Sequence, residues 1–161
     1  MNKIIIFVFI LFQLNGFSQV ELGQSSSQTL YLLNHFIKEH PNWEMEKVYD
    51  QGELKEVTIY QYGQLFQDLL IKADAIQRFV MKDGVYALNI LQFPSLTLEQ
   101  LQTKYHSYYK NSRIGDYYFD EDFEYQRTIE LVDETASILY QKTIFDELPI
   151  TVQQKIEHKG I

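Results

Sequence analysis

A short pattern of apolar and turn-forming positions recurs four times between Tyr49 and Tyr86. Each copy places a large apolar or aromatic residue three positions before a turn-forming residue, and another one two positions after it. The turn-forming residues follow one another at steps of 11, 11 and 10, and they are Gly52, Gly63, Asp74 and Gly84. Turn residues at regular steps, with β-rich segments between them, predict strands joined by tight hairpins.

The pattern predicts five antiparallel strands in sequence order, which form a meander. Their ranges are 43–49, 54–60, 65–71, 76–81 and 85–92. The third range also fits a helical turn, because its apolar residues fall at helical spacing as well; the regular steps favour the strand. The hairpin around Lys82-Asp83-Gly84 has the strongest turn signal of the series.

Three helices flank these strands. Ser25 and Gln28 form a capping-box pattern before residues 26–39, and Pro41 ends that helix. Thr97 and Gln100 repeat the pattern before residues 98–109. A last helix is expected over residues 149–157, opened by the proline at its first position.

A second hairpin is expected near the C-terminus. Phe123, Tyr125, Arg127 and Ile129 alternate with polar residues, which predicts a strand over 122–132. Asp133-Glu134 turns the chain into a partner strand over 136–143. The sequence therefore predicts one α+β domain over residues 19–161: a mainly antiparallel sheet, with a five-strand meander and a C-terminal hairpin, and helices packed on one face.

The first eighteen residues predict a signal peptide. Lys3 gives a positive start, an apolar run follows from Ile4 to Leu14, and small residues precede a cut between Ser18 and Gln19. The run is shorter than the roughly 20 residues that span a bilayer, although retention as an anchor is the alternative. The mature chain is expected to be periplasmic or secreted. It has no cysteine, so it must be stable without disulfides.

Negative charge is concentrated in one part of the chain. Without Lys3 the sequence has 13 basic and 22 acidic residues, a net charge of −9. Ten of the acids lie between Asp116 and Glu147, where only Arg127 and Lys142 oppose them. Such a field disfavours nucleic acid and anionic membranes and favours cations or basic proteins as partners. A solvated surface that keeps the protein soluble is the simpler interpretation.

Two stretches resemble known families. The phrases that begin at Tyr49 and Tyr60 resemble the MORN-type repeats of exported proteins, which would imply an interaction scaffold without catalysis. The copies that begin at Ile71 and Met81 depart from that motif. The segment from Ile138 to Ile156 is similar to the end of PepSY-like exported proteins, which would imply an inhibitory or peptidase-regulating role.

The best candidate for a functional surface is the acidic and aromatic segment 116–125. Its carboxylates and tyrosines could grip a basic protein, with aromatic anchors inside an acidic rim. The residues expected to bind are Asp116, Tyr117, Tyr118, Asp120, Asp122, Glu124 and Tyr125. Asp120, Asp122 and Glu124 are expected on one strand face, where calcium binding is an alternative. Core aromatics with a solvated acidic edge form the third interpretation.

No catalytic signature is present. The four histidines lack zinc-site spacing, and there is no glycine-rich phosphate loop or serine nucleophile motif. Carboxylate pairs suited to glycoside hydrolysis can be drawn in any acidic protein. We therefore expect no cofactor or metal and a binding role, with a basic envelope or secreted protein as partner. A small apolar-ligand carrier, with a pocket between sheet and helices, is the alternative, and an enzyme of unknown type comes third.

Overall fold

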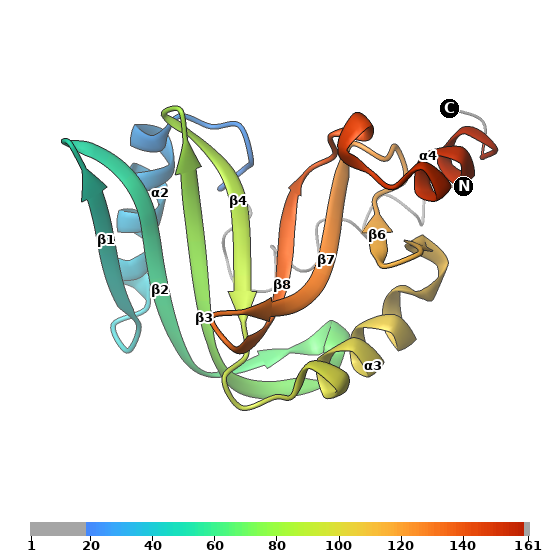
Figure 1. Ribbon diagram of the computed structural model, residues 1–161. Coiled ribbons are helices and arrows are strands. Elements are labelled where there is room, and N and C mark those ends of the chain that lie inside the picture. The colour runs from blue at the N-terminus through green and yellow to red at the C-terminus, as the bar shows by residue number, and fades with distance from the viewer. Residues whose placement is uncertain (1–18, 160–161) are drawn as a thin grey trace, which may run out of the picture.

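The structure, a computed structural model, describes residues 19–159, and these form an eight-stranded antiparallel sheet with three helices (Figure 1). The strand order is β1-β2-β3-β4-β8-β7-β6-β5. The strands are β1 (Glu44–Asp50), β2 (Glu53–Phe66), β3 (Ile71–Lys82), β4 (Val85–Gln92), β5 (Arg113–Ile114), β6 (Tyr117–Phe119), β7 (Tyr125–Val132) and β8 (Thr135–Lys142). This confirms the α+β class and the antiparallel sheet. The predicted signal peptide lies outside the described residues.

The meander has four strands, and the prediction of five was wrong. Residues 65–71 are the end of β2, a short 3-10 helix η1 (Gln67–Leu69) and the start of β3, so they are not a separate strand. Gly63, which was expected to mark a turn, has a φ of +61° at an irregularity in the β2–β3 register. Its N–H donates to Asp74 Oδ1 over 2.7 Å. Glycine permits a bulge as readily as a turn, and here the strand continues through it.

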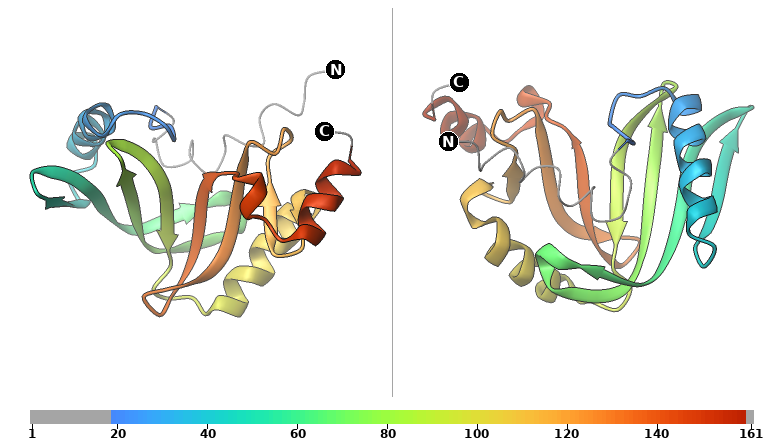
Figure 2. Two further views of the ribbon diagram at one scale, coloured as in Figure 1. Left: turned by 45° about the horizontal axis from the view of Figure 1, so that its top comes forward. Right: turned by 180° about the vertical axis from the view of Figure 1, so that it is seen from behind.

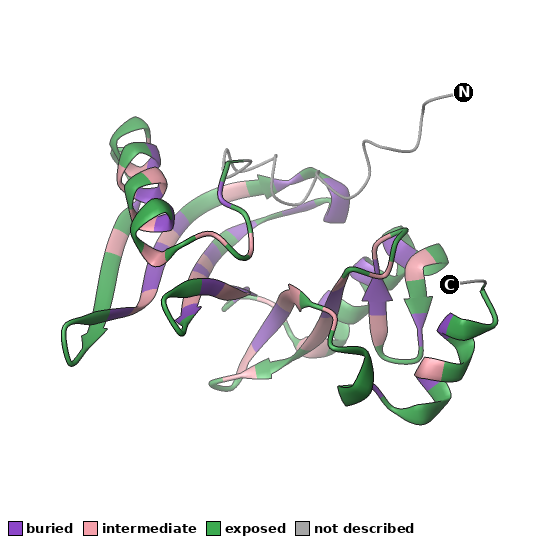
Figure 3. Cartoon of the chain, turned by 90° about the horizontal axis from the view of Figure 1, so that it is seen from above, coloured by how far each residue is buried: buried purple, intermediate pink, exposed green. Residues whose placement is uncertain are grey.

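The helices are α2 (Ser26–Glu39), α3 (Leu98–Tyr109) and α4 (Ile150–Glu157). All three were predicted. Ser25 Oγ accepts the Gln28 N–H, while Thr97 and Gln100 complete a reciprocal capping box. Figure 2 shows α2 along the first strands of the sheet and α3 near its other half. Figure 3 shows buried residues along one side of α2 and exposed residues along the other.

Both long helices pack on the same face of the sheet. Ile71, Ala73 and Ala75 of β3 belong to the apolar cluster under α3, whereas Phe79 and Met81 belong to the cluster under α2. These residues alternate along one strand, so their side chains share one face. The short helix α4 packs separately against Ile114 and Phe119. The expectation of helices against one face therefore holds for α2 and α3.

A buried polar row separates the two apolar clusters. Gln61 Nε2 donates to Gln77 Oε1 over 2.9 Å, and Gln77 Nε2 donates to Asn89 Oδ1 over 3.3 Å. The row continues by register, because Asn89 pairs with Tyr140 of β8, and Tyr140 pairs with Arg127 of β7. Directly paired residues of antiparallel strands project on the same side. The row thus brings Arg127 to the helix-covered face.

The C-terminal hairpin was predicted, but the structure of the segment that precedes it was not. β7 begins at Tyr125 rather than at 122, and the two short strands β5 and β6 precede it. Phe123 lies in the intervening turn with a φ of +57°, a left-handed conformation that is rare for a bulky residue. Asp120, Asp122 and Glu124 consequently lie in or beside a turn, and the expectation that they share a strand face was wrong. None of the described helices is long and apolar enough to cross a membrane.

Candidate functional site

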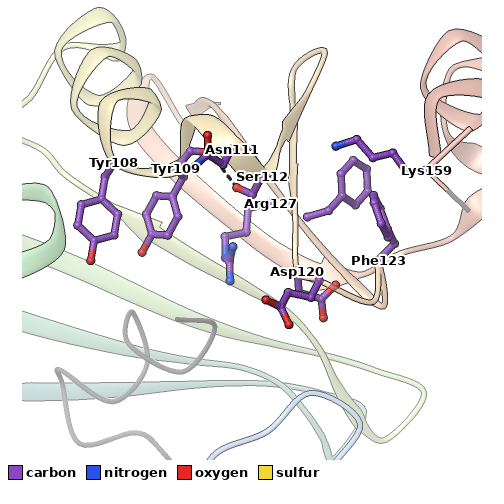
Figure 4. A pocket seen from close by; sticks show the side chains of 10 residues that line it. Tyr108, Tyr109, Asn111, Ser112, Asp120, Phe123, Arg127 and Lys159 are labelled. Carbon is purple, nitrogen blue, oxygen red and sulfur yellow. Dashed lines mark hydrogen bonds between the residues drawn. The ribbon is translucent and has the colours of Figure 1, made fainter. Parts of the chain in front are cut away.

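A cleft of about 670 Å³ opens between the end of α3, the turn that joins β6 to β7, and β7 itself. Figure 4 shows side chains of α3, of this turn and of β7 around it. Ten residues line it: Tyr108, Tyr109, Asn111, Ser112, Phe119, Asp120, Glu121, Phe123, Arg127 and Lys159. The walls combine aromatic rings with a few polar and charged groups. That composition is typical of small-molecule sites.

Arg127 is the most buried charged group of the cleft, at 4% exposed. Its Cζ lies 5.7 Å from the centre of the Tyr109 ring and 5.2 Å from that of Tyr140. Among the described residues, no carboxylate lies within ion-pair distance of its guanidinium, and its Nε has no hydrogen-bond partner. The rings hold the guanidinium in place without neutralising it. A buried charge without a partner is costly, so this position demands an explanation.

The tyrosine wall is fixed by a carboxylate. Tyr108 Oη donates to Asp68 Oδ1 over 3.3 Å, and Tyr109 Oη donates to Asp68 Oδ2 over 3.2 Å. Asp68 lies in η1, so these bonds tie the end of α3 to the tip of the β2–β3 arm. Burial raises the pKa of the Asp68 carboxyl, and the two hydroxyl donors only partly offset this.

Burial also keeps the phenols around Arg127 neutral. It raises the pKa of Tyr105 to about 12 against the opposing effect of the Arg127 charge. Burial likewise raises the pKa of Tyr109 and of Tyr140. At neutral pH these tyrosines supply rings and hydroxyl groups but no negative charge. The guanidinium charge therefore stays available to a ligand.

Asp120 forms the opposite side of the cleft (Figure 4). Its Oδ1 accepts the N–H of Tyr125 over 3.1 Å, which orders the turn before β7. Burial raises the pKa of this carboxyl, although the Tyr125 N–H and the Arg127 charge act in the other direction. Phe123 contacts Phe119 at 5.4 Å between ring centres and completes the apolar side. The space between Arg127 and Asp120 is therefore bounded by opposite charges that do not touch.

The structure does not bring the seven residues of the predicted surface together. Asp120 alone lines the Arg127 cleft. Asp116, Tyr117 and Tyr118 line a second hollow of about 740 Å³ that also includes His106 and Arg113. Asp122 and Glu124 are exposed in the turn, and Tyr125 is half-buried and stacked on Tyr140 with ring centres 5.5 Å apart. Tyr118 is buried in the core cluster beneath α3.

Arg127 lines this cleft, and sequence reasoning did not single it out as a candidate site residue. The signal was present, because an arginine occupied one of four alternating positions otherwise filled by aromatic or aliphatic residues. It was also one of two bases among ten acids. Its tyrosine partners could not be found in this way, since Tyr109 and Tyr140 come from a different helix and strand. Only the folded sheet shows that they surround it.

The calcium alternative finds no local support. Within residues 19–159 no three His, Asp or Glu side chains gather closely enough to hold a metal ion.

Comparison of the chain with protein-family models, with curated proteins and with solved structures found no match. The resemblances to MORN-type and PepSY-like proteins therefore stay predictions, and function must be argued from the site itself.

Proposed function

We propose that this chain is an exported small-molecule-binding protein that takes its ligand in the Arg127 cleft. The observation that supports this best is the cleft itself, with a volume of about 670 Å³ and a mixed aromatic and polar lining. Ligand pockets in proteins have volumes of about 300–1,000 Å³ and place a few polar groups among apolar walls. Export itself is still an expectation from the N-terminal sequence.

The elements around the cleft suit a binding site better than an accidental gap. Tyr109 comes from a helix tied to η1 by Asp68, and Arg127 comes from a strand paired on both sides. Side chains fixed in this way lose little conformational entropy when a ligand binds. Asn111, two residues after α3 ends, is both exposed and part of the lining, so it lies where the cleft meets solvent.

The first test is whether the cleft binds small molecules at all. Residues 19–161, purified from the periplasm of an expression host, would be examined by native mass spectrometry for a bound mass. The same protein would be screened by thermal shift with benzoate, benzamide and benzyl alcohol. Asn111→Trp should fill the mouth of the cleft and abolish binding, whereas the matched change Asn42→Trp, in the turn after α2, should not. Absence of any bound mass and any shift would refute the proposal.

Recognition of a basic protein is the second candidate, supported by the exposed acidic turn. Glu121, Asp122 and Glu124 are all exposed between β6 and β7. The aromatic anchors expected beside them are less available, because Tyr118 and Phe119 are 4% and 3% exposed. Salt separates the two candidates. A basic protein held by this turn should dissociate as salt rises, because exposed charges are screened over about 8 Å at physiological ionic strength. A ligand inside the cleft should be retained.

A further inference from the structure

We propose that the ligand carries an oxyanion, a carboxylate or a phosphoryl or sulfuryl group, and that the Arg127 guanidinium binds it. This rests on the proposed function, and it names the ligand class of the same cleft. Three features support it: the other two arginines have carboxylate partners, aromatic rings surround the Arg127 guanidinium, and aromatic surface lines the rest of the cleft.

Arg127 is the most buried of the three arginines, and it is the one without a carboxylate partner. Arg78 pairs with Glu56 at 2.7 Å and with Asp133 at 2.9 Å. Arg113 lies 3.8 Å from Asp116. In a chain with 22 acidic residues a partner is easily supplied, yet none reaches Arg127 among the described residues. A ligand oxyanion would provide the missing countercharge and remove the cost of the unpaired buried cation.

The guanidinium is presented in a way that suits an oxyanion. Beside the rings of Tyr109 and Tyr140, and near the Tyr105 hydroxyl, the guanidinium borders the cleft. Its Nε–H is unsatisfied among the described residues. A guanidinium edge donates two parallel N–H groups to a carboxylate or a phosphate, which gives both strength and orientation.

The other lining residues limit the rest of the ligand. Tyr108, Tyr109, Phe119 and Phe123 offer aromatic surface to an apolar body. Asp120 and Glu121 border the same cleft, and Lys159 adds a second positive charge to its lining. The lining therefore favours a ligand with an oxyanion on a small apolar or aromatic body.

The decisive measurement compares benzoate with its neutral analogue benzamide, which has nearly the same shape. Titration calorimetry and thermal shift on residues 19–161, at matched ionic strength, should show binding of benzoate and not of benzamide. Phenyl phosphate and benzenesulfonate in parallel arms show which oxyanion the site prefers. The proposal would be overturned if benzamide bound at least as tightly as each of the three anions. It would also be overturned if none of the three anions bound.

Arg127→Met tests the residue, and Arg113→Met is the matched control. Arg113 also lies over a tyrosine ring, with its Cζ 5.9 Å from the centre of Tyr118, but outside this cleft. Arg127→Met should weaken the preferred anion about 10- to 100-fold, because hydrogen bonds to charged groups are among the stronger ones. Arg113→Met should leave it unchanged. Equal losses in both variants, or no loss in Arg127→Met, would refute the assignment.

A stability measurement separates this role from a structural one. If Arg127 serves the ligand, Arg127→Met without ligand should melt at the same temperature as the wild type or higher, because it removes an unpaired buried charge. A lower melting temperature would indicate a structural role. If Arg127→Met does not fold, Arg127→Lys replaces it, and there the anion must still bind more weakly.

The two proposals fail in different ways. A neutral ligand that native mass spectrometry finds, and that Asn111→Trp excludes, would leave the binding function standing and refute the oxyanion. Absence of every ligand would refute both. Anions that bind despite Asn111→Trp would place their site outside the cleft and refute the assignment to Arg127.

Discussion

The hydroxyl of Tyr109 donates to Oδ2 of Asp68 over 3.2 Å, and this bond connects α3 to the far tip of the β2–β3 arm. Tyr108 donates to the other oxygen of the same carboxylate. One acidic side chain in η1 therefore positions the tyrosine wall of the cleft. Its ionisation should affect the stability of the protein and the shape of the cleft together.

Asp68→Asn is expected to change how stability depends on pH. Burial raises the pKa of Asp68 in the folded state, so the folded protein binds this proton more tightly than the unfolded chain. The contribution is fully present below the unfolded pKa, near 3.8, and is lost as pH rises through the raised folded value. The wild type should therefore lose stability relative to Asp68→Asn as pH rises above about 3.8, the ordinary pKa of an aspartate.

Urea unfolding of both proteins across this pH range measures the effect. The difference between the two curves removes the contributions of other carboxyl groups, which both proteins share. A gap that widens in favour of the wild type as pH rises would contradict the expected sign.

Glu56→Gln is expected to destabilise the protein at neutral pH. Glu56 accepts two hydrogen bonds from Arg78, at 2.7 and 3.0 Å, and a third from Thr58. We expect a loss of roughly 1 kcal/mol, since hydrogen bonds between charged groups are strong but solvent screens a pair that is not fully buried. Asp133→Asn, at a carboxylate 78% exposed, should cost less.

The same pair predicts sensitivity to acid. Burial alone would raise the pKa of Glu56, but the hydrogen bonds from Arg78 and Thr58 together lower it below 4.5. The stability that this carboxylate contributes is present above the unfolded value and is lost as pH falls through the folded pKa. The free energy of unfolding of the wild type should therefore fall more steeply with decreasing pH than that of Glu56→Gln. Equal slopes for the two proteins would contradict this assignment.

Gly63→Ala should destabilise the bulge in β2. The residue has a φ of +61°, and an added Cβ would meet nothing within 4 Å. The cost is thus that of the left-handed backbone alone, about 1–2 kcal/mol. Chemical denaturation would measure it, with Gln64→Ala at the adjacent position as the control. A neutral Gly63→Ala would mean that the strand can straighten at no cost.

Leu70→Asn should have the opposite effect. Leu70 follows η1 with a φ of +51° and is 82% exposed, so it is strained and buries little. Asparagine tolerates this conformation better than leucine. We expect a gain of about 1 kcal/mol or less, part of the roughly 1–2 kcal/mol that the left-handed conformation costs an ordinary residue. A loss of stability in thermal unfolding would show that the leucine makes contacts that its exposure does not suggest.

Capping boxes and hairpin turns predicted most of the fold, because each is formed by residues within a few positions of one another in the sequence. Thr97 and Gln100 located the start of α3, and Asp83-Gly84 located the β3–β4 hairpin. The failure at Gly63 has a physical cause: a bulge and a turn both need a left-handed residue. What distinguishes them is the pairing of Gly63 with Asp74 across two strands, which no local pattern contains.

The candidate site was less predictable for the same reason. Of the seven residues expected to bind, Asp120 lines the cleft. Of the interpretations of its aromatic residues, a place in the core holds for Tyr118 and Phe119, which are buried. The aromatic surroundings of Arg127 could not be predicted, because α3 packing brings Tyr109 to it and the β7–β8 register brings Tyr140.

The β4–β8 pairing divides the sheet into two halves of consecutive strands. β1 to β4 form one half and β5 to β8 the other, and they meet where Leu88–Gln92 pairs with Ser137–Gln141. Pairs within each half close short loops, whereas this central pairing must bring distant parts of the chain together. We expect the halves to form early and to join late in folding. The cleft, whose aromatic wall depends on Asp68 from one half and on Tyr109 from the segment leading into the other, would then exist only after the last step.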